Sequence, residues 1–181
     1  MPPIDRARIE AAVAEILEAI GEDAQRPGLL TTPQRVAESY TEFFAGVGVD
    51  PVPLLSDEVE MQTDPGERGE LVLLRDIPFQ ALCEHHLLPF RGVVHVGYLP
   101  GARIVGVSLP VRVVDHFARG LQLQERLTEE VADWLGAHLD ARGVGVVVEA
   151  EHLCMSFRGI GTSATTLRTS AFRGELERLP S

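Results

Sequence analysis

The feature that most constrains this chain is a pair of cysteine- and histidine-bearing segments that lie far apart in the sequence. The first is Cys83-Glu84-His85-His86 and the second is His152-Leu153-Cys154, and together they hold both cysteines and three of the six histidines. Thiolate sulfur and imidazole nitrogen suit zinc, and three protein ligands that leave a fourth position open are typical of catalytic zinc. A fold that uses both segments must bring them to one place.

Cys83, His86 and Cys154 are the candidate zinc ligands. Two residues separate Cys83 from His86, so one turn can present both side chains to a single ion, and Cys154 would complete the set. The first pair alone is weak evidence, and the second segment is what favours a shared zinc site. A disulfide between the two cysteines is the weaker interpretation, because both have histidine neighbours and we expect a reducing compartment.

His85 and His152 are the histidines of these segments that the ligand set leaves over. They could orient the ligands through hydrogen bonds, or they could serve as general acid and base in a zinc-dependent hydrolysis, since imidazole titrates near neutral pH. The residues alone leave both interpretations open. A zinc ion would serve such a hydrolysis by lowering the pKa of its water to roughly 7.

Composition narrows the class of protein. The chain has 181 residues with a hydrophobic share of 45%, which suits one packed domain. Its net charge of −11 argues against a nucleic-acid partner, and a polyphosphate substrate would need cations gathered locally. All sixteen basic residues are arginine. We find no N-terminal leader and no apolar run near the roughly 18 residues of a membrane span, and therefore expect a cytoplasmic protein with no membrane partner.

Residues 1–46 have the pattern of two helices. Apolar residues recur at helical spacing from Ile9 to Ile20. Thr32-Pro33 is a good start for the second helix, because a capping hydroxyl precedes a proline at the first helical position, and Gly46 should end that helix.

The remainder of the chain mixes strand and helix patterns. Residues 47–70 are rich in proline, glycine and acid, and we expect a loop there. Strand-like runs lie at 71–74, 93–98, 103–107, 144–149 and 162–169, and helical patterns lie at 110–118 and 121–139. This order predicts an α+β domain with an antiparallel sheet.

Three charged residues could contact a substrate. Glu125, near the start of the long helix, is either a solvated carboxylate or a partner for two adjacent N–H donors, such as those of guanine. Arg112 and Arg158 are either surface charges or guanidinium forks for phosphate. The residue types alone do not decide between these interpretations.

The motifs closely resemble those of GTP cyclohydrolase I. Family signatures are similar to the runs CEHHLLPF at 83–90, QLQERLT at 122–128 and HLCM at 152–155, followed by Arg158-Gly159. The run TPQR at 32–35 resembles the family's N-terminal helix entry. The likeness covers almost the whole chain, and these motifs in this order are highly specific.

The resemblance implies a tunnelling fold of the α+β class, in which an antiparallel four-stranded sheet carries two helices on one face. Residues 1–46 would be an N-terminal helical extension and residues 47–181 the catalytic domain. Subunits of that family join into a barrel, commonly a decamer, with active sites between subunits. We therefore expect a homo-oligomer.

The resemblance also implies a reaction. Water activated by zinc would add to C8 of GTP, the imidazole ring would open, and formate would leave. The ribose would then undergo an Amadori rearrangement, and ring closure would give 7,8-dihydroneopterin triphosphate. Such a product would place the chain in tetrahydrofolate or other pterin biosynthesis, within one-carbon metabolism, or on a route to deazapurines.

The family's site residues carry over position by position. Zinc would be bound by Cys83, His86 and Cys154, and protons near C8 would be transferred by His85 and His152. The remaining contacts to the substrate would come from Ser108 at the ribose, Glu125 and Gln124 at the guanine, and Arg112 and Arg158 at the phosphates.

Two departures from the family pattern concern the phosphate end of the site. Leu109 occupies the position at which the family has a lysine that contacts the triphosphate. Gly120 occupies a position at which the family usually has an arginine. A charged hydrogen bond is worth about 1.5–3 kcal/mol, so such losses would weaken phosphate binding. Two alternatives follow. One is a diverged cyclohydrolase that relaxes the triphosphate requirement, uses another guanine nucleotide or stops at the formamidopyrimidine. The other is a non-catalytic zinc-bound scaffold.

Overall fold

The computed structural model describes residues 4–57, 61–62, 69–158 and 165–178. Its centre is a sheet in which four long strands are antiparallel neighbours. They are β2 (Val72–Cys83), β3 (Pro89–Pro100), β6 (Ala141–His152) and β7 (Thr166–Gly174). A short strand, β5 (Leu121–Gln122), pairs parallel with the end of β2. The expected four-stranded antiparallel sheet is confirmed, with this addition at its edge.

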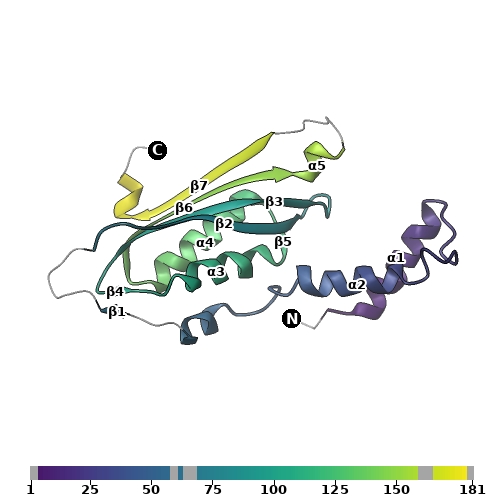
Figure 1. Cartoon of the computed structure of the whole chain (residues 1–181), viewed down its shortest axis with the longest axis horizontal. Coiled ribbons are helices and arrows are strands. Elements are labelled where there is room, and N and C mark those ends of the chain that lie inside the picture. Colours follow the sequence, from purple (N-terminus) through teal and green to yellow (C-terminus); the bar gives the residue numbers. More distant parts are fainter. Residues whose placement is uncertain (1–3, 58–60, 63–68, 159–164, 179–181) are drawn as a thin grey trace.

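Two helices, α3 (Ser108–Ala118) and α4 (Gln124–His138), cover one face of the sheet (Figure 1). Successive side chains of a strand point to opposite faces, and the inward ones pack on these helices. Leu127, Val131 and Leu135 recur at helical spacing along α4 and are fully buried. The predicted α+β class, with two helices on one face, is confirmed.

β2 is longer than the expected strand at 71–74. Arg75, Asp76 and Pro78 interrupt the apolar pattern, but the ladder to β3 continues after a register shift between Leu74 and Ile77. Asp76 adopts a positive φ of 59° at this bulge. The bulge absorbs the irregular residues, and the strand then runs on to Cys83 at the end of the sheet.

The expected strand at 103–107 is wrong beyond its first two residues. β4 (Arg103–Ile104) pairs with β1 (Met61–Gln62), and α3 begins at Ser108. The expected helix at 121–139 begins later, at Gln124, because the preceding residues form β5. In both places a short pairing, which local propensity does not reveal, sets the boundary.

The predicted loop at 47–70 and the predicted strand at 162–169 also differ in detail from the structure. The expected loop at 47–70 contains a 3₁₀ helix, η1 (Val52–Asp57), and β1, while 58–60 and 63–68 lie outside the described residues. The strand expected at 162–169 corresponds to β7, and 162–164 lie outside the described residues. The chain ends its described part in a second 3₁₀ helix, η2 (Glu175–Arg178).

The two N-terminal helices form as expected, as α1 (Arg6–Ala19) and α2 (Thr32–Phe43). Figure 1 shows them side by side beyond the end of the sheet. The Asp5 carboxylate caps α1 by accepting from the Arg8 amide at 3.1 Å. No residue of α1 is buried in this chain, and Ile16 and Ile20 are 57% and 68% exposed.

Gly46 lies where the chain leaves α2 and meets the end of α3. Its amide donates to the Arg119 carbonyl at 3.0 Å. A Cβ at this position would lie 2.4 Å from the His116 carbonyl oxygen, so only glycine allows the approach.

Among the described residues, no helix has both the length and the apolarity to cross a membrane.

Candidate active site

The end of β2 and the end of β6 meet at one end of the sheet (Figure 1). After Cys83 the chain makes a tight turn, in which the Leu87 amide donates to the Cys83 carbonyl at 2.9 Å. The Cys83 amide in turn donates to the Leu88 carbonyl at 2.9 Å. β3 then returns beside β6 with Phe90 opposite His152. This register brings the short helix α5 (Leu153–Ser156) to the turn.

The candidate ligand atoms of Cys83, His86 and Cys154 all lie within 4.8 Å of one another. Both cysteines are free thiols, so the disulfide alternative does not describe this structure. Around one tetrahedral zinc such atoms stand about 3.5–3.8 Å apart, so a small contraction would suffice. The donor set and its spacing therefore fit a zinc ion. Cys83 is buried and His86 is exposed, so the cluster opens to solvent on one side.

The electrostatics of the two thiols also favour a cation. Burial raises the pKa of the Cys154 thiol. Electrostatic repulsion from the Cys83 thiolate and the hydrogen bond between the two cysteine side chains raise this pKa further. The Arg158 guanidinium opposes this rise. Two neighbouring thiolates repel each other, and a metal ion that binds both removes that cost while releasing their protons.

His152 is held from two sides. Its ring stacks on Phe90, with centroids 4.6 Å apart and planes at 5°. Its Nε2 lies 2.8 Å from Oε1 of Gln124. Burial lowers the pKa of the His152 imidazole, and the Glu125 carboxylate partly offsets that effect. The neutral ring is therefore favoured around physiological pH, as a general base requires.

Gln124 was expected beside Glu125 at the substrate, and that role stays a prediction. The structure shows that its side chain is fully buried. Its Nε2 donates to the carbonyls of Val148 and Leu167 at 3.1 and 3.0 Å and approaches Thr169 Oγ1 at 3.2 Å. The first turn of α4 is thereby fixed to β6 and β7.

Glu84, in the turn that follows Cys83, is tied to α4. Arg126 Nη2 donates to Glu84 Oε2 at 2.6 Å and to the Leu121 carbonyl at 2.8 Å, while its Nε donates to Gln122 Oε1 at 3.1 Å. The Glu84 amide donates to the Gln122 carbonyl at 3.1 Å. One guanidinium thus joins the turn, β5 and α4.

Three other expected residues, His85, Glu125 and Arg158, are exposed. The rings of His85 and His86 stand edge to face with centroids 6.2 Å apart, and both residues are exposed. Glu125 is exposed in the first turn of α4. Arg158 is exposed just beyond α5. The Glu125 carboxylate acts electrostatically on His152, and the Arg158 guanidinium on Cys154, so both charges lie near the candidate site.

Ser108 and Arg112 belong to a different element, α3. Ser108 is the first residue of the helix and is exposed, and Nη2 of Arg112 donates to the Leu54 carbonyl of η1 at 3.0 Å. Their roles at ribose and phosphate stay predictions.

The two departures from the family pattern have different structural settings. Leu109 is fully buried in the core between α3 and the sheet. This explains why no arginine stands there, because a buried charge without a partner is costly. At Gly120 an added Cβ would meet Val47 at an ordinary 3.6 Å, so that position has room for a side chain.

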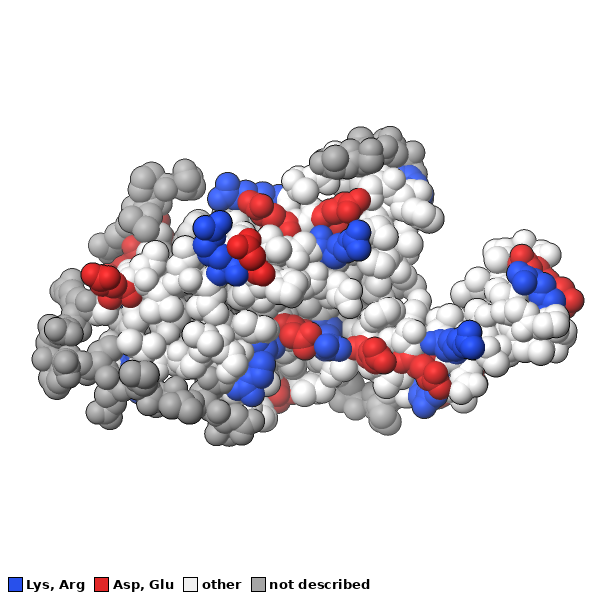
Figure 2. All heavy atoms as spheres, viewed as in Figure 1, with Lys and Arg blue, Asp and Glu red and all other residues white. Residues whose placement is uncertain are grey.

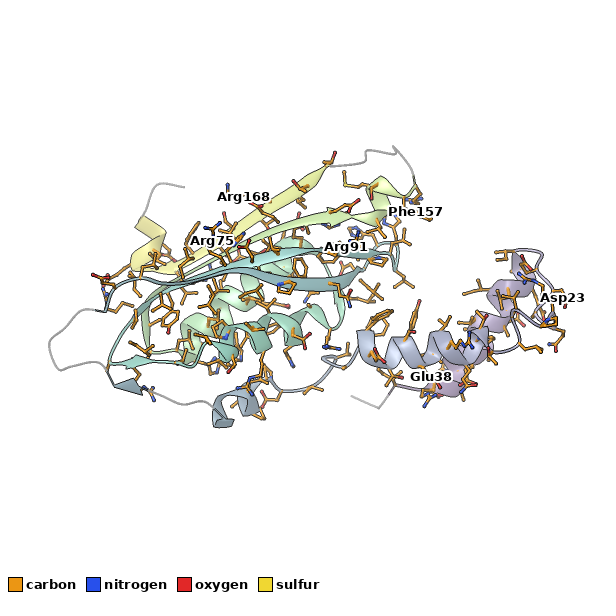
Figure 3. The ribbon with its side chains drawn as sticks, viewed as in Figure 1. Asp23, Glu38, Arg75, Arg91, Phe157 and Arg168 are labelled. Atoms are coloured by element: carbon orange, nitrogen blue, oxygen red, sulfur yellow. The ribbon has the colours of Figure 1, made fainter. Side chains whose placement is uncertain are left out.

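Cations on the visible surface are mostly paired locally. Figure 2 shows basic and acidic side chains next to one another over the sheet and along α2. Figure 3 shows Arg75, Arg91 and Arg168 on strands of the sheet. Arg168 Nε lies 3.7 Å from Glu149 Oε1. Arg158, just beyond α5, is also exposed, and its guanidinium acts electrostatically on the Cys154 thiol.

Sequence reasoning gave no role to Phe90, Glu84 or Arg126. All three lie inside the matched motifs, which was the signal that could have found them. Their contacts depend on the register of β3 against β6 and on the pairing of β5 with β2. Spacing along the chain does not reveal either.

Comparison with known proteins agrees with this geometry. The family model for GTP cyclohydrolase I matches residues 9–181. GTP cyclohydrolase 1 of Leifsonia xyli is 53% identical over 175 residues, which cover 97% of this chain and 90% of that protein. GTP cyclohydrolase 1 of Mycolicibacterium gilvum is 52% identical over 178 residues, covering 97% and 86%.

A solved structure of an archaeosine synthase QueF-like protein in the apo form is also similar in shape. It has a TM-score of 0.47 and 20% identity, and the match covers 60% of this chain and 97% of that one. A TM-score this low gives the likeness no weight, and the assignment depends on the sequence matches. These matches span nearly the whole chain and include the segments that form the cluster, so the chain belongs to the GTP cyclohydrolase I family.

Proposed function

We propose that this protein is a zinc-dependent GTP cyclohydrolase I, which opens the purine at C8, releases formate and forms 7,8-dihydroneopterin triphosphate. The observation that carries the proposal is the convergence of Cys83, His86 and Cys154 beside His152, from two segments far apart in sequence. Two relatives above 50% identity are named GTP cyclohydrolase 1, which supports the same activity. A scaffold that only bound zinc would not need a second, separately held histidine at this place.

Cys83, His86 and Cys154 would hold the zinc. When bound, the ion supplies a Lewis acid that makes water nucleophilic near neutral pH. His85 and His152 would move protons near C8, and Glu125 would accept from the N–H donors of guanine. Ser108 at the ribose, and Arg112 and Arg158 at the phosphates, complete the proposed contacts.

Turnover by the zinc-loaded protein tests the function. GTP, GMP and guanosine would be compared by formate release and by pterin fluorescence after oxidation. Formate and pterin from GTP alone are expected. Formate without pterin would mean that the reaction stops at the formamidopyrimidine, and turnover of GMP or guanosine would mean a relaxed triphosphate requirement.

Leu109→Lys should destabilise the protein and should not restore a phosphate contact. Because Leu109 is fully buried, the ammonium group would lie among apolar side chains. We expect the free energy of unfolding to fall by more than about 3 kcal/mol, against less than about 1.5 kcal/mol for the control Leu109→Met. Urea unfolding and the KM for GTP would be measured together. A stable lysine variant with a lower KM would show that this position faces the substrate.

Arg126→Met should weaken zinc binding by about 10–100-fold, because the turn that carries Cys83 and His86 would lose its tie to α4. The matched control is Arg119→Met, since Arg119 pairs with Asp115 at 2.7 Å and has a similar exposed side-chain fraction of 42% against 41%. Zinc affinity would be measured by competition with a chromogenic chelator. Equal affinities in the two variants would contradict a supporting role for Arg126.

We further propose a cytoplasmic homo-oligomer, a decamer by analogy with the family, with sites between subunits. Exposed apolar side chains support an interface: Ile20, just after α1, is 68% exposed, and Phe157, just after α5, is 81% exposed (Figure 3 labels Phe157). A reducing cytoplasm would keep both thiols available to a metal. We also propose that residues 1–46 form an extension to a catalytic domain of residues 47–181.

A further inference from the structure

Gln124 joins four protein groups through one side-chain amide. Its Nε2 lies 3.1 Å from the Val148 carbonyl, 3.0 Å from the Leu167 carbonyl and 3.2 Å from Thr169 Oγ1. Its Oε1 lies 2.8 Å from His152 Nε2. The whole residue is buried, so these contacts are made away from solvent.

The orientation of this amide is fixed by its partners. Backbone carbonyls only accept hydrogen bonds, so the NH₂ group must face Val148 and Leu167. A flipped amide would set Oε1 against two carbonyl oxygens with no hydrogen between them, which is costly in a buried place.

The two neighbouring threonines agree with that orientation. Thr128 Oγ1 donates to the Gln124 carbonyl at 2.7 Å, which uses its hydroxyl hydrogen. In the 2.6 Å contact between the two hydroxyls, Thr169 is therefore the donor. Gln124 Nε2 has two hydrogens for three acceptors, so Thr169 Oγ1, at 3.2 Å, can only share one of them with a backbone carbonyl.

With Oε1 as an acceptor, Nε2 of His152 must carry a hydrogen. A neutral imidazole has one N–H, so Nδ1 is left with the lone pair. The Phe90 stack fixes the plane of the ring. We propose that Gln124 is a positioning residue that holds neutral His152 as the Nε2–H tautomer, so that Nδ1 exchanges protons during ring opening. This inference rests on the function proposed for the same site.

Two proton transfers balance the step. As a water oxygen bonds to C8, the π electrons of the C8–N7 bond move to N7, and Nδ1 takes the proton that the water loses and gives it to N7. When the C8–N9 bond then breaks, its electron pair goes to N9, the C8 hydroxyl becomes the formyl oxygen, and Nδ1 carries the hydroxyl proton to N9, so His152 ends neutral. The Nε2–H hydrogen bond to Gln124 persists throughout, because an amide oxygen does not take the proton.

The test reads the tautomer directly. Zinc-loaded full-length protein labelled with nitrogen-15 histidine would be studied by two-bond proton–nitrogen correlation at about pH 8, where histidines are neutral. His152→Asn identifies the signals of His152. His138 is an internal reference of the opposite kind, because its Nδ1 lies 2.8 Å from the Trp134 carbonyl and must donate.

Gln124→Met should convert the His152 signals from the Nε2–H pattern to a mixture of tautomers, and leave those of His138 unchanged. We expect kcat with GTP to fall by about 10–100-fold with little change in KM. Gln122→Met is the matched control, because Gln122 is also buried but bonds to Phe117, Glu130 and Arg126. That control should leave the His152 pattern intact.

Two results would overturn the inference. One is an Nε2–H pattern that persists in Gln124→Met, and the other is a raised KM with unchanged kcat, which would make Gln124 a substrate ligand. If the methionine variant does not fold, Gln124→Asn can be used instead. Its side chain is one methylene shorter, so the amide oxygen no longer reaches His152 Nε2, and the Nε2–H pattern of His152 should be lost in the same way. Failure of the proposed function would show separately, as wild-type protein that releases no formate from GTP.

Discussion

Replacing His152 with alanine should lower formate release from GTP by about 10²- to 10⁴-fold, the range typical of a lost general acid–base residue. Zinc should remain bound, because the candidate ligand set is Cys83, His86 and Cys154. The variant would be compared with wild type by formate release and by zinc content of the purified protein. The imidazole lies against Phe90 and Gln124, so some loss of thermal stability is also expected.

His138→Ala serves as the control for the His152 experiment. His138 ends α4, stacks on Trp134 with centroids 4.4 Å apart, and belongs to neither matched histidine segment. Its removal should leave turnover near the wild-type rate. Loss of zinc from His152→Ala, with folding otherwise unchanged, would make His152 a ligand or an essential ligand support and would contradict the assigned role.

Replacing Cys154 with alanine should abolish both zinc binding and turnover. Only one cysteine and one histidine of the candidate set would remain, and the loss of zinc affinity should exceed the about 10–100-fold typical of a supporting residue. Met155→Ala is the matched control, because Met155 is the next residue of α5 and is exposed. It should keep the metal.

Zinc content and formate release would be measured on Cys154→Ala and on Met155→Ala after dialysis against limiting metal. Full zinc occupancy in Cys154→Ala would show that the ion is held elsewhere. Full turnover without zinc in the same variant would remove the metal from the mechanism altogether.

The long elements of the fold could be predicted because their patterns are strong. Four valines between 144 and 148, interrupted only by Gly145, lie in β6, and the apolar stripe of Leu127, Val131 and Leu135 lies in α4. The sequence predicts too short a strand for β2, because Arg75, Asp76 and Pro78 interrupt the apolar pattern. Only the hydrogen-bonded pairing with β3 shows that a bulge accommodates these residues.

The candidate ligands could also be predicted from the sequence, since cysteine and histidine at close spacing carry a specific chemistry. The contacts that hold the candidate site together could not be predicted. The stack of Phe90 on His152 depends on strand register, and the bond from Arg126 to Glu84 depends on a two-residue strand. Leu109 looked like a missing substrate contact, and the structure shows a core side chain.

We propose that Cys83, His86 and Cys154 hold a zinc ion that the chain needs to open GTP. The most direct test is formate release by one wild-type preparation as purified, after removal of metal by a chelator, and after addition of zinc. We expect formate and pterin from GTP, their loss when about one zinc per chain is removed, and their return when zinc is added. Formate release that is unchanged after complete removal of metal would contradict it.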